Sequence, residues 1–347
     1  MSAPNLIDIA RRAGVGKSTA ARALSGTGAV SESTRAKVLR AAEACKYRAN
    51  TAARTLRRGH SRLLGVAMSD STSRGFLSFA VTAQKLEGIA HGAKWLGYDL
   101  QLFIEDLEDV EALRRLTIEK DVRGFFFNGH VQPAVLDLLK RYRIPWIGLN
   151  WRHADRPADP HCWTDFAHAG RTLSGHLAAI GCRRVLSNDW LSAAYGPYAD
   201  GLRAGWQAAG RAASDLVILS GYDLRSGARF SAEIERALDG ANPPDGILSS
   251  FDGGVKDIYR ALRERGLRPG ADIAVATFDD LEVAANLEIP CTAYLQPTFE
   301  MGETAVREMD RLLTQAQRGD VARDIPGTLN VRESTRLFQA RNRAETH

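Results

Sequence analysis

From Leu63 onward the sequence alternates short apolar runs with amphipathic stretches, and this alternation restricts the fold more than any other feature. We expect nine strands, most of them separated from the next by a helical pattern. Strands joined through helices form parallel sheets that are covered on both faces, with right-handed crossovers. Nine strands over roughly 270 residues fit two doubly wound sheets of an α/β fold better than one, with ligands bound at the carboxyl ends of the strands. The expected strands are LLGVAM, DLQLFI, GFFF, WIGL, RVL, LVIL, GILS, IAVATF and TAYL.

The stretch AGVGKSTAARALSG near the N-terminus contains GKST, the second half of a nucleotide-binding P-loop. The complete motif needs a glycine five residues before the second one, where this chain has Arg11. It also needs a preceding buried strand, whereas Leu6, Ile9, Ala10 and Ala13 recur at the spacing of one helix face. Both requirements fail, so we reject the P-loop.

The same residues fit a helix-turn-helix. Gly14 suits a tight turn after the first helix, and a second helix is expected over 17–24, with small residues that allow close packing. Ser31 is positioned to cap a third helix, which closes a three-helix bundle. Such a motif lays the first turn of its second helix in the DNA major groove, which nominates Lys17, Ser18 and Arg22 as base and phosphate contacts. On this stretch alone, a helical hairpin with a solvated basic face remains an equal alternative.

The distribution of charge separates these alternatives. Residues 1–62 hold thirteen Lys or Arg against three Asp or Glu, a net charge of +10. The whole chain carries +5, so the other 285 residues carry −5. A basic module on a mildly acidic body is typical of nucleic-acid binding, and a solvated face more often mixes the signs.

Composition excludes several other classes of protein. No run of eighteen apolar residues is present, and the N-terminus lacks the basic-then-apolar order of a signal peptide, so we expect a cytoplasmic protein with no membrane partner. The four cysteines are far apart and the eight histidines are scattered, which predicts reduced thiols and no metal. No GxSxG elbow is present, so we expect neither an enzyme nor a cofactor.

Several blocks of sequence, in order, resemble the lactose-repressor (LacI/GalR) family of transcriptional regulators. The resemblance runs from about Leu6 to Arg336. Its blocks are LIDIARRAGVGKSTAARALSG, VSESTRAKVLRAAEACKYRANTAARTLRRG, LLGVAMSD, FDGGVKDIYRALRERGLRPGADIAVATFDD, LQPTFEMGETAVREM and LNVRESTR.

The resemblance implies a domain organisation. A DNA-binding headpiece is expected over 1–48, a hinge over 49–62, a periplasmic-binding-protein-like core over 63–340 and a tail over 341–347. The core divides into an N-subdomain (about 63–162 and 294–325) and a C-subdomain (about 163–293 and 326–340). The family dimerises so that two headpieces read a pseudo-palindromic operator, and we expect a homodimer because no leucine heptads follow Met309.

The resemblance also implies DNA contacts. Lys17 and Ser18 would face base edges, with Arg22 on the same helix surface and Thr19 on the phosphates. Asn50 and the AARTL segment, which begins at Ala52 and includes Ala53, would form the hinge, and Leu56 would wedge into the minor groove. An apolar linker residue is the plainer interpretation of Leu56. Gly16, Ala21 and Ala49 stand where the family usually has serine, serine and proline, which suggests a nonstandard operator.

The family's effector pocket lies between the two core subdomains. Carboxylates and amides that pair with hydroxyls, together with aromatic faces, suit a sugar. Leu202 stands where family members usually carry an arginine, so no bidentate partner for an anion is expected there. We therefore expect a neutral effector, a sugar ahead of a nucleobase-like ring. The positions that match the family's pocket are Asp70, Phe76, Asn150, Trp151, Phe251, Asp252, Asp279 and Gln296.

The predicted function is a ligand-responsive DNA-binding transcriptional regulator, with repression as the more common family outcome. Two other classes are weighed against it. An enzyme acting through GKST or a carboxylate pair lacks the motifs named above. A solute-binding protein with an incidental extension is disfavoured by the +10 headpiece.

Overall fold

The computed structural model divides the chain into two compact units, residues 1–62 and 63–347. The residues that it describes are 5–25, 29–45, 61–69, 80–105, 109–119, 121–129, 131–151, 156, 158–189, 197–220, 227–315 and 321–345.

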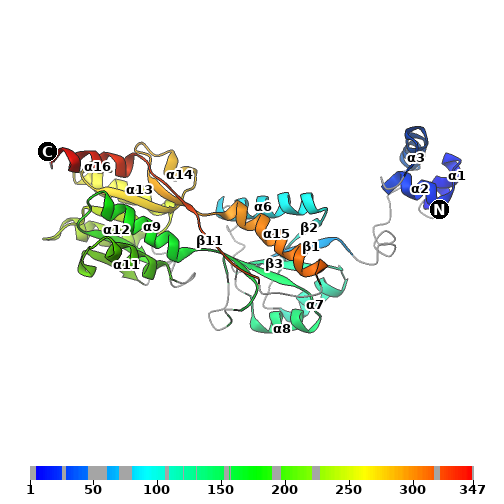
Figure 1. The fold of residues 1–347 in the computed structure, drawn as a ribbon, viewed down its shortest axis with the longest axis horizontal. Coiled ribbons are helices and arrows are strands. Elements are labelled where there is room, and N and C mark those ends of the chain that lie inside the picture. The colour runs from blue at the N-terminus through cyan, green and yellow to red at the C-terminus, as the bar shows by residue number, and fades with distance from the viewer. Residues whose placement is uncertain are drawn as a thin grey trace. The chain divides into compact units, whose positions relative to one another are not determined.

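The first unit contains three helices, α1 (Leu6–Ala13), α2 (Lys17–Ser25) and α3 (Glu32–Ala44) (Figure 1). Asn5 and Asp8 form a reciprocal capping box at the start of α1, and Gly14 ends it with a φ of 67°, in the left-handed region that favours glycine. Ser31 caps α3 as expected, because its hydroxyl accepts a hydrogen bond from the Thr34 amide at 3.3 Å. The three-helix bundle is therefore confirmed.

The second unit contains two sheets of six strands each. The first sheet has the order β11-β5-β4-β3-β1-β2, and its strands run parallel. These strands are β1 (Leu63–Ser69), β2 (Asp99–Glu105), β3 (Gly124–Asn128), β4 (Trp146–Leu149), β5 (His161–Thr164) and β11 (Ala322–Ile325). Helices cover both faces (Figure 1), with α6 (Ala80–Leu96) and α15 (Thr298–Thr314) on one side and α7 (Val110–Glu119) and α8 (Pro133–Arg141) on the other.

The alternation of side chains along β3 explains why both faces are covered. Phe125, Phe126 and Phe127 have no exposed surface. Phe126 packs into the apolar cluster beneath α6 and α15, whereas Phe125 and Phe127 pack toward α7 and α8. A strand that is apolar on both faces needs helices on both, as parallel sheets require.

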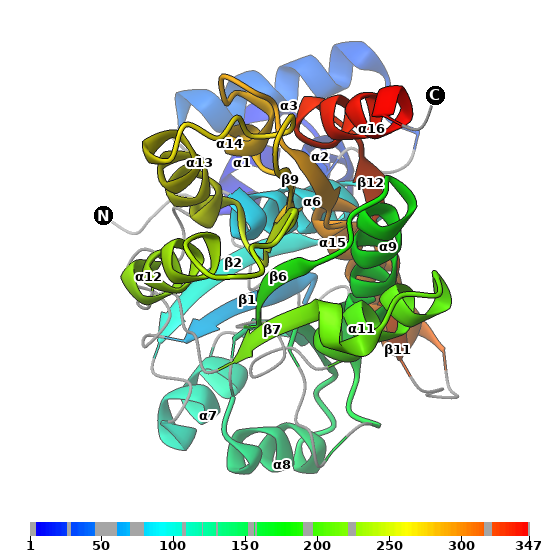
Figure 2. The same ribbon diagram turned by 90° about the vertical axis from the view of Figure 1, so that its left-hand side faces the viewer.

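The second sheet has the order β12-β10-β9-β8-β6-β7, and only the pair β10 and β12 is antiparallel among its described pairings. Its strands are β6 (Val185–Asp189), β7 (Leu216–Ser220), β8 (Gly246–Ser249), β9 (Ala274–Asp279), β10 (Thr292–Leu295) and β12 (Thr328–Asn330). Around it lie α9 (Phe166–Ala179), α11 (Tyr198–Ala208), α12 (Gly227–Leu238), α13 (Val255–Glu264), α14 (Glu282–Ala285) and α16 (Glu333–Glu345). Figure 2 shows α9 and α11 on one side of β6 and β7, with α12 on the other. The predicted α/β fold with two doubly wound sheets is thus confirmed.

The chain passes between the two sheets three times. It leaves β5 for α9 at Asp165, returns from β10 to α15 at Gln296 and Pro297, and crosses again between β11 and β12 at Pro326 and Gly327. The boundaries expected from sequence were 162/163, 293/294 and 325/326. Each crossing follows the carboxyl end of a strand, so these connections lie next to the edge where ligands bind in such folds.

Three strands were not expected from the sequence. Strands β11 (ARDI) and β12 (TLN) are short edge strands whose residues are at least partly exposed, so they carry little apolar signal. The four residues of β5 (HCWT) are buried but include a histidine and a threonine. On α3, Leu39 is 50% exposed, whereas Ala41 takes a place in the headpiece core. Among the described helices, none is long and apolar enough to cross a membrane.

Close packing of α6 on α15 requires glycine in both helices, which gives a stability prediction. A Cβ on Gly302 would lie 2.7 Å from the Ile89 nitrogen and 2.9 Å from the carbonyl carbon of Gly88. Gly302→Ala should therefore destabilise the core by about 1–3 kcal/mol in urea unfolding. Gly175→Ala in α9 is the matched control, since no atom lies within 4 Å of its added Cβ and helix propensity should raise stability by about 0.5–1 kcal/mol. Equal effects of the two substitutions would contradict this packing.

Candidate functional site

Helix α2 presents a polar surface formed by its first two turns. Lys17, Ser18 and Arg22 are exposed, whereas Ala20 and Ala23 are buried in the headpiece core with at most 3% exposure. Ser18 and Arg22 are four residues apart, so both lie on one helix face. Thr19 is half-buried at the edge of this surface. The arrangement suits a helix that inserts its first turn into a DNA groove.

Five residues nominated from sequence lie outside the described part of the chain. They are the hinge residues Asn50, Ala53 and Leu56 and the pocket residues Asp70 and Phe76.

In the core, four polar side chains join the ends of strands from both sheets. Asn150 follows β4, and its Nδ2 donates to Oε1 of Gln296 at 3.1 Å. The Thr164 hydroxyl, at the end of β5, donates to the same oxygen at 3.1 Å, and the Thr164 amide donates to Oδ1 of Asn150 at 2.7 Å. The Gln296 Nε2 then donates to Oδ1 of Asp279, the last residue of β9, at 2.5 Å. The first sheet is thereby linked to the second through buried amides, and we call these four residues the strand-end network.

Two residues of the strand-end network have unusual backbone angles. The φ of Asn150 is 49° and that of Asp279 is 106°, both in a region where side chains other than glycine are uncommon. Such strain persists only where surrounding contacts hold it, and it concentrates at functional sites. The hydrogen bonds of the network supply that restraint.

Asp252 lies beside Asp279, whose carboxyl accepts a hydrogen bond from the Asp252 amide. The Oδ2 of Asp252 accepts from the Leu281 amide at 2.5 Å, while its Oδ1 is buried without a partner among the described residues. Burial raises the pKa of Asp252 to about 7. Burial, together with the charge of Asp252, also raises the pKa of Asp279 well above its ordinary value. The unpartnered Oδ1 of Asp252 therefore lies where ionisation of both carboxyl groups at once is unfavourable.

Two further polar residues, Lys85 and Asn128, were not predicted from the sequence. Lys85 on α6 is 5% exposed, and its ammonium donates to Oδ1 of Asn128, the last residue of β3. Burial lowers the pKa of Lys85 to about 8, and the charge of Asp279 opposes that shift. The strand-end rule would have identified Asn128 after GFFF. Lys85 was detectable as a cation four residues before Ile89 on the buried helix face.

The two aromatic nominees do not join the strand-end network through any contact that the structure describes. Trp151 packs against the apolar cluster of Phe127 and Trp146 on the α7 and α8 side of the first sheet. Phe251 precedes a short 3-10 helix, and its ring lies next to Gly253 and Gly254. Leu202, where the family usually has arginine, is fully buried in the core between α9 and α11. It contributes no polar group to the strand ends.

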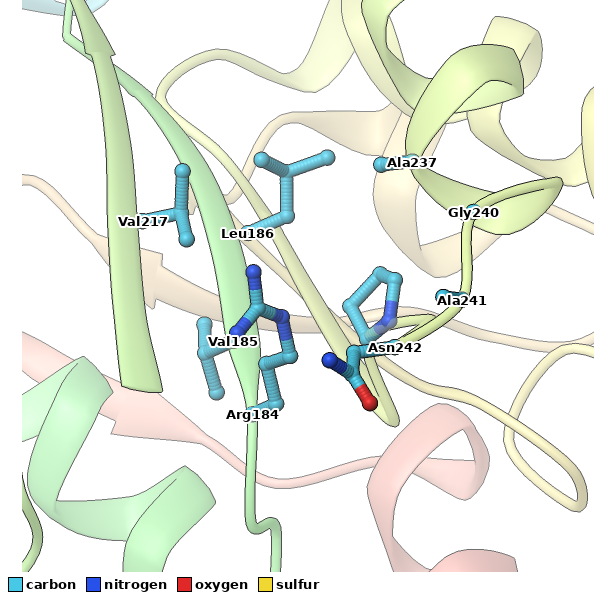
Figure 3. A pocket seen from close by; sticks show the side chains of 9 residues that line it. Arg184, Val185, Leu186, Val217, Ala237, Gly240, Ala241 and Asn242 are labelled. Carbon is cyan, nitrogen blue, oxygen red and sulfur yellow. The ribbon is translucent and has the colours of Figure 1, made fainter. Parts of the chain in front are cut away.

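Two cavities on the core are lined by residues that the structure describes. One, of about 300 Å³, opens at the amino-terminal ends of β6, β7 and β8, where Arg184 and Asn242 line it (Figure 3). The other, of about 570 Å³, is bounded by α6, the start of α15 and the crossing segments, with Gln296 in its wall. Only the second touches the strand-end network. Among the described residues, no cluster of histidine, cysteine, aspartate or glutamate is arranged to hold a metal ion.

Two family models match the chain. Residues 5–50 match the bacterial regulatory proteins of the lacI family, and residues 175–335 match a periplasmic binding protein-like domain. Curated relatives extend over nearly the whole length. The HTH-type transcriptional regulator CelR of Thermobifida fusca is 28% identical over 95% of this chain and 98% of its own. The ribose operon repressor of Escherichia coli K12 is 25% identical over 89% of this chain and 92% of its own. Both are named as regulators or repressors, in agreement with the prediction that this chain is not an enzyme.

Solved structures share the fold. A lac repressor dimer bound to operator and the anti-inducer ONPF superposes with a TM-score of 0.75 at 24% identity, covering 96% of this chain and 99% of that one. A CelR–cellobiose complex gives a TM-score of 0.66 at 24% identity, with coverage of 95% and 99%. This chain belongs to the lactose-repressor (lacI) family of transcriptional regulators.

Proposed function

We propose that this regulator is a repressor that binds a pseudo-palindromic operator as a homodimer, and that a sugar bound at the strand ends of the core sets its affinity for DNA. The observation that carries the proposal is the strand-end network, because Gln296 connects Asn150 of one sheet to Asp279 of the other. Relatives include a ribose operon repressor and a regulator solved with cellobiose. A regulator of operator DNA works in the cytoplasm, which is where we place it.

Differential affinity is the physical basis of this regulation. A ligand shifts the balance between two core closures only if it binds one of them better. Sugar hydroxyls donate to carboxylates and accept from amides, so a bound sugar competes for Asp279, Asn150 and Gln296. It therefore changes the contacts that link the two sheets. The hinge, with Asn50, Ala53 and Leu56, is proposed to transmit that change to the headpiece.

A nucleobase-like effector is the alternative, since a flat ring needs an aromatic face at the site. Trp151 instead packs within the cluster around Phe127. The polar strand-end network favours a polyhydroxylated ligand. A solute-binding protein without a regulatory role is disfavoured by the lacI-type match over 5–50.

The headpiece proposal predicts a specific loss of operator recognition. Duplexes selected from a random pool should share one pseudo-palindrome with half-sites about one helical turn apart. Lys17→Ala should weaken binding to that operator by about 10–100-fold and relax its discrimination between bases, because a side chain that reads base edges contributes about 1–3 kcal/mol. Lys37→Ala, an equal loss of charge at an exposed position of α3, is the control. Equal losses for both variants in fluorescence anisotropy would mean that Lys17 contributes only charge.

The core proposal predicts that a mutation can weaken sugar binding without weakening operator binding. Asp279→Asn preserves the side-chain volume but replaces one carboxyl oxygen with an NH₂ group that can only donate, so sugar affinity should fall at least tenfold by calorimetry. Operator binding without ligand should remain. Asp200→Asn, at an exposed side chain of α11, is the control. An unchanged sugar affinity in Asp279→Asn would remove Asp279 from the site.

The raised pKa of Asp252 predicts how core stability depends on pH. In the unfolded chain this carboxyl loses its proton near pH 4, whereas in the folded core it keeps the proton up to about pH 7. The folded state therefore binds more protons between these values, and the free energy of unfolding should fall as pH rises from 4 to 7, by up to about 1.4 kcal/mol per pH unit for one proton.

Asp252→Asn should remove this contribution. Urea unfolding followed by tryptophan fluorescence reports on the core, because all six tryptophans lie beyond Leu63. Parallel profiles for the wild type and Asp252→Asn between pH 5 and 8 would show that Asp252 does not titrate in this range. Asp200→Asn again serves as the control.

A further inference from the structure

Lys85 places a positive charge at the ligand-binding edge of the core. Its side chain extends from α6 to Asn128 at the end of β3, and it responds to the charge of Asp279 at the end of β9. The ammonium group therefore lies at the end of β3 and interacts electrostatically with Asp279 of β9. No other lysine is among the buried residues of the described chain.

The hydrogen-bond donors around Lys85 outnumber the acceptors that the structure gives them. An ammonium group has three N–H donors, and the structure gives Lys85 one acceptor, Oδ1 of Asn128. The Nδ2 of Asn128 is buried without a partner among the described residues, and so is the hydroxyl of Thr82, one turn before Lys85 on α6. Asn128 is 3% exposed and Thr82 is 1% exposed, so little water reaches them. Buried donors without acceptors are costly unless a ligand completes them.

Asp279 does not neutralise Lys85 fully. Its carboxyl accepts from Gln296 Nε2 at 2.5 Å and from the Asp252 amide, and it lies beside a second carboxyl. Burial and that neighbouring charge favour its protonated form. The site thus has a donor end, Lys85 and Asn128, and an acceptor end, Asp252 and Asp279. The free Oδ1 of Asp252 belongs to the acceptor end.

We propose that the effector is a sugar acid, an aldonate or uronate, whose single carboxylate accepts hydrogen bonds from Lys85 and Asn128 while its hydroxyls donate to the acceptor end. This inference rests on the proposed function, that the strand-end site binds a sugar. It replaces the expectation of a neutral ligand, which followed from Leu202. Leu202 contributes no cation, but Lys85 supplies one from a different helix.

A carboxylate fits this site better than a phosphate. The donor end carries one cation, which matches one negative charge. A phosphate group carries about −1.5 to −2 at neutral pH and would face Asp252 and Asp279 with charge left over. A phosphorylated sugar is therefore a competing outcome of the test.

The test compares sugars with their own acids by calorimetry on the full-length protein. The probes are glucose, gluconate, glucuronate and glucose 6-phosphate, with the corresponding galactose set. At least one acid should bind tenfold or more tightly than its neutral parent. Lys85→Met should remove that preference, and Lys94→Met, at an exposed position of the same helix, should keep it.

Each other result has a defined meaning. Equal or tighter binding of the neutral parent overturns the sugar acid and leaves the sugar proposal standing. Tighter binding of the phosphate overturns the carboxylate. Binding of none of the probes counts against the sugar proposal itself, and the acid falls with it.

Two measurements guard against misfolding of the variant. Lys85→Met removes a buried charge with incomplete pairing, so its melting temperature without ligand should equal or exceed that of the wild type. Asn128→Asp keeps Lys85 but pairs it internally and repels a carboxylate, so it should also lose the preference for the acid. Retention of that preference in folded Asn128→Asp would overturn the proposal.

Discussion

The hydrogen bonds from Asn150 through Gln296 to Asp279 are the interaction on which the core depends most. Trp163 of β5 packs into the apolar cluster of the second sheet, while the segments that connect the two sheets cross at strand ends, where polar backbone and side chains must find partners. Gln296 lies on one of these crossings and satisfies groups from both sheets with a single amide. In addition to the apolar packing of Trp163, the two sheets are therefore joined by hydrogen bonds through the Gln296 amide. Such contacts are exchanged easily for those of a ligand.

The charges near this network show why the site favours a bound ligand. The ammonium group of Lys85, the Nδ2 of Asn128 and the Oδ1 of Asp252 leave part of their hydrogen-bonding capacity unused, and burial raises the pKa of the neighbouring Asp279. In an apolar core, selection for stability would replace such groups. Here they gather at the carboxyl ends of β3, β8 and β9, where an α/β fold places its ligands. The ligand expected here has a group that accepts hydrogen bonds from Lys85 and Asn128 and hydroxyls that donate to Asp252 and Asp279.

Sequence patterns were sufficient for the elements whose burial is uniform. The run GFFF lies in β3, where every residue is buried, and IAVATF overlaps β9, where every residue but the last is buried. Edge strands such as β11 were not predicted, because they are defined by pairing with a neighbouring strand rather than by apolar content. Of the residues predicted to line the pocket, Asn150, Gln296 and Asp279 are joined by hydrogen bonds and Asp252 lies beside Asp279, whereas Trp151 packs against an apolar cluster.

What remained hidden depends on long-range contacts. Lys85 and Asn128 are 43 residues apart, and nothing in the local pattern pairs them. A lysine on a helix is ordinarily solvated, so its burial is visible only once α15 and the strand ends enclose it. Leu202 shows the same limit. The sequence indicates that no arginine stands at this position, but it does not show that Lys85 on α6 brings a cation to the site. Electrostatic character of a pocket is a property of the assembled fold, and the substitution of one side chain does not determine it.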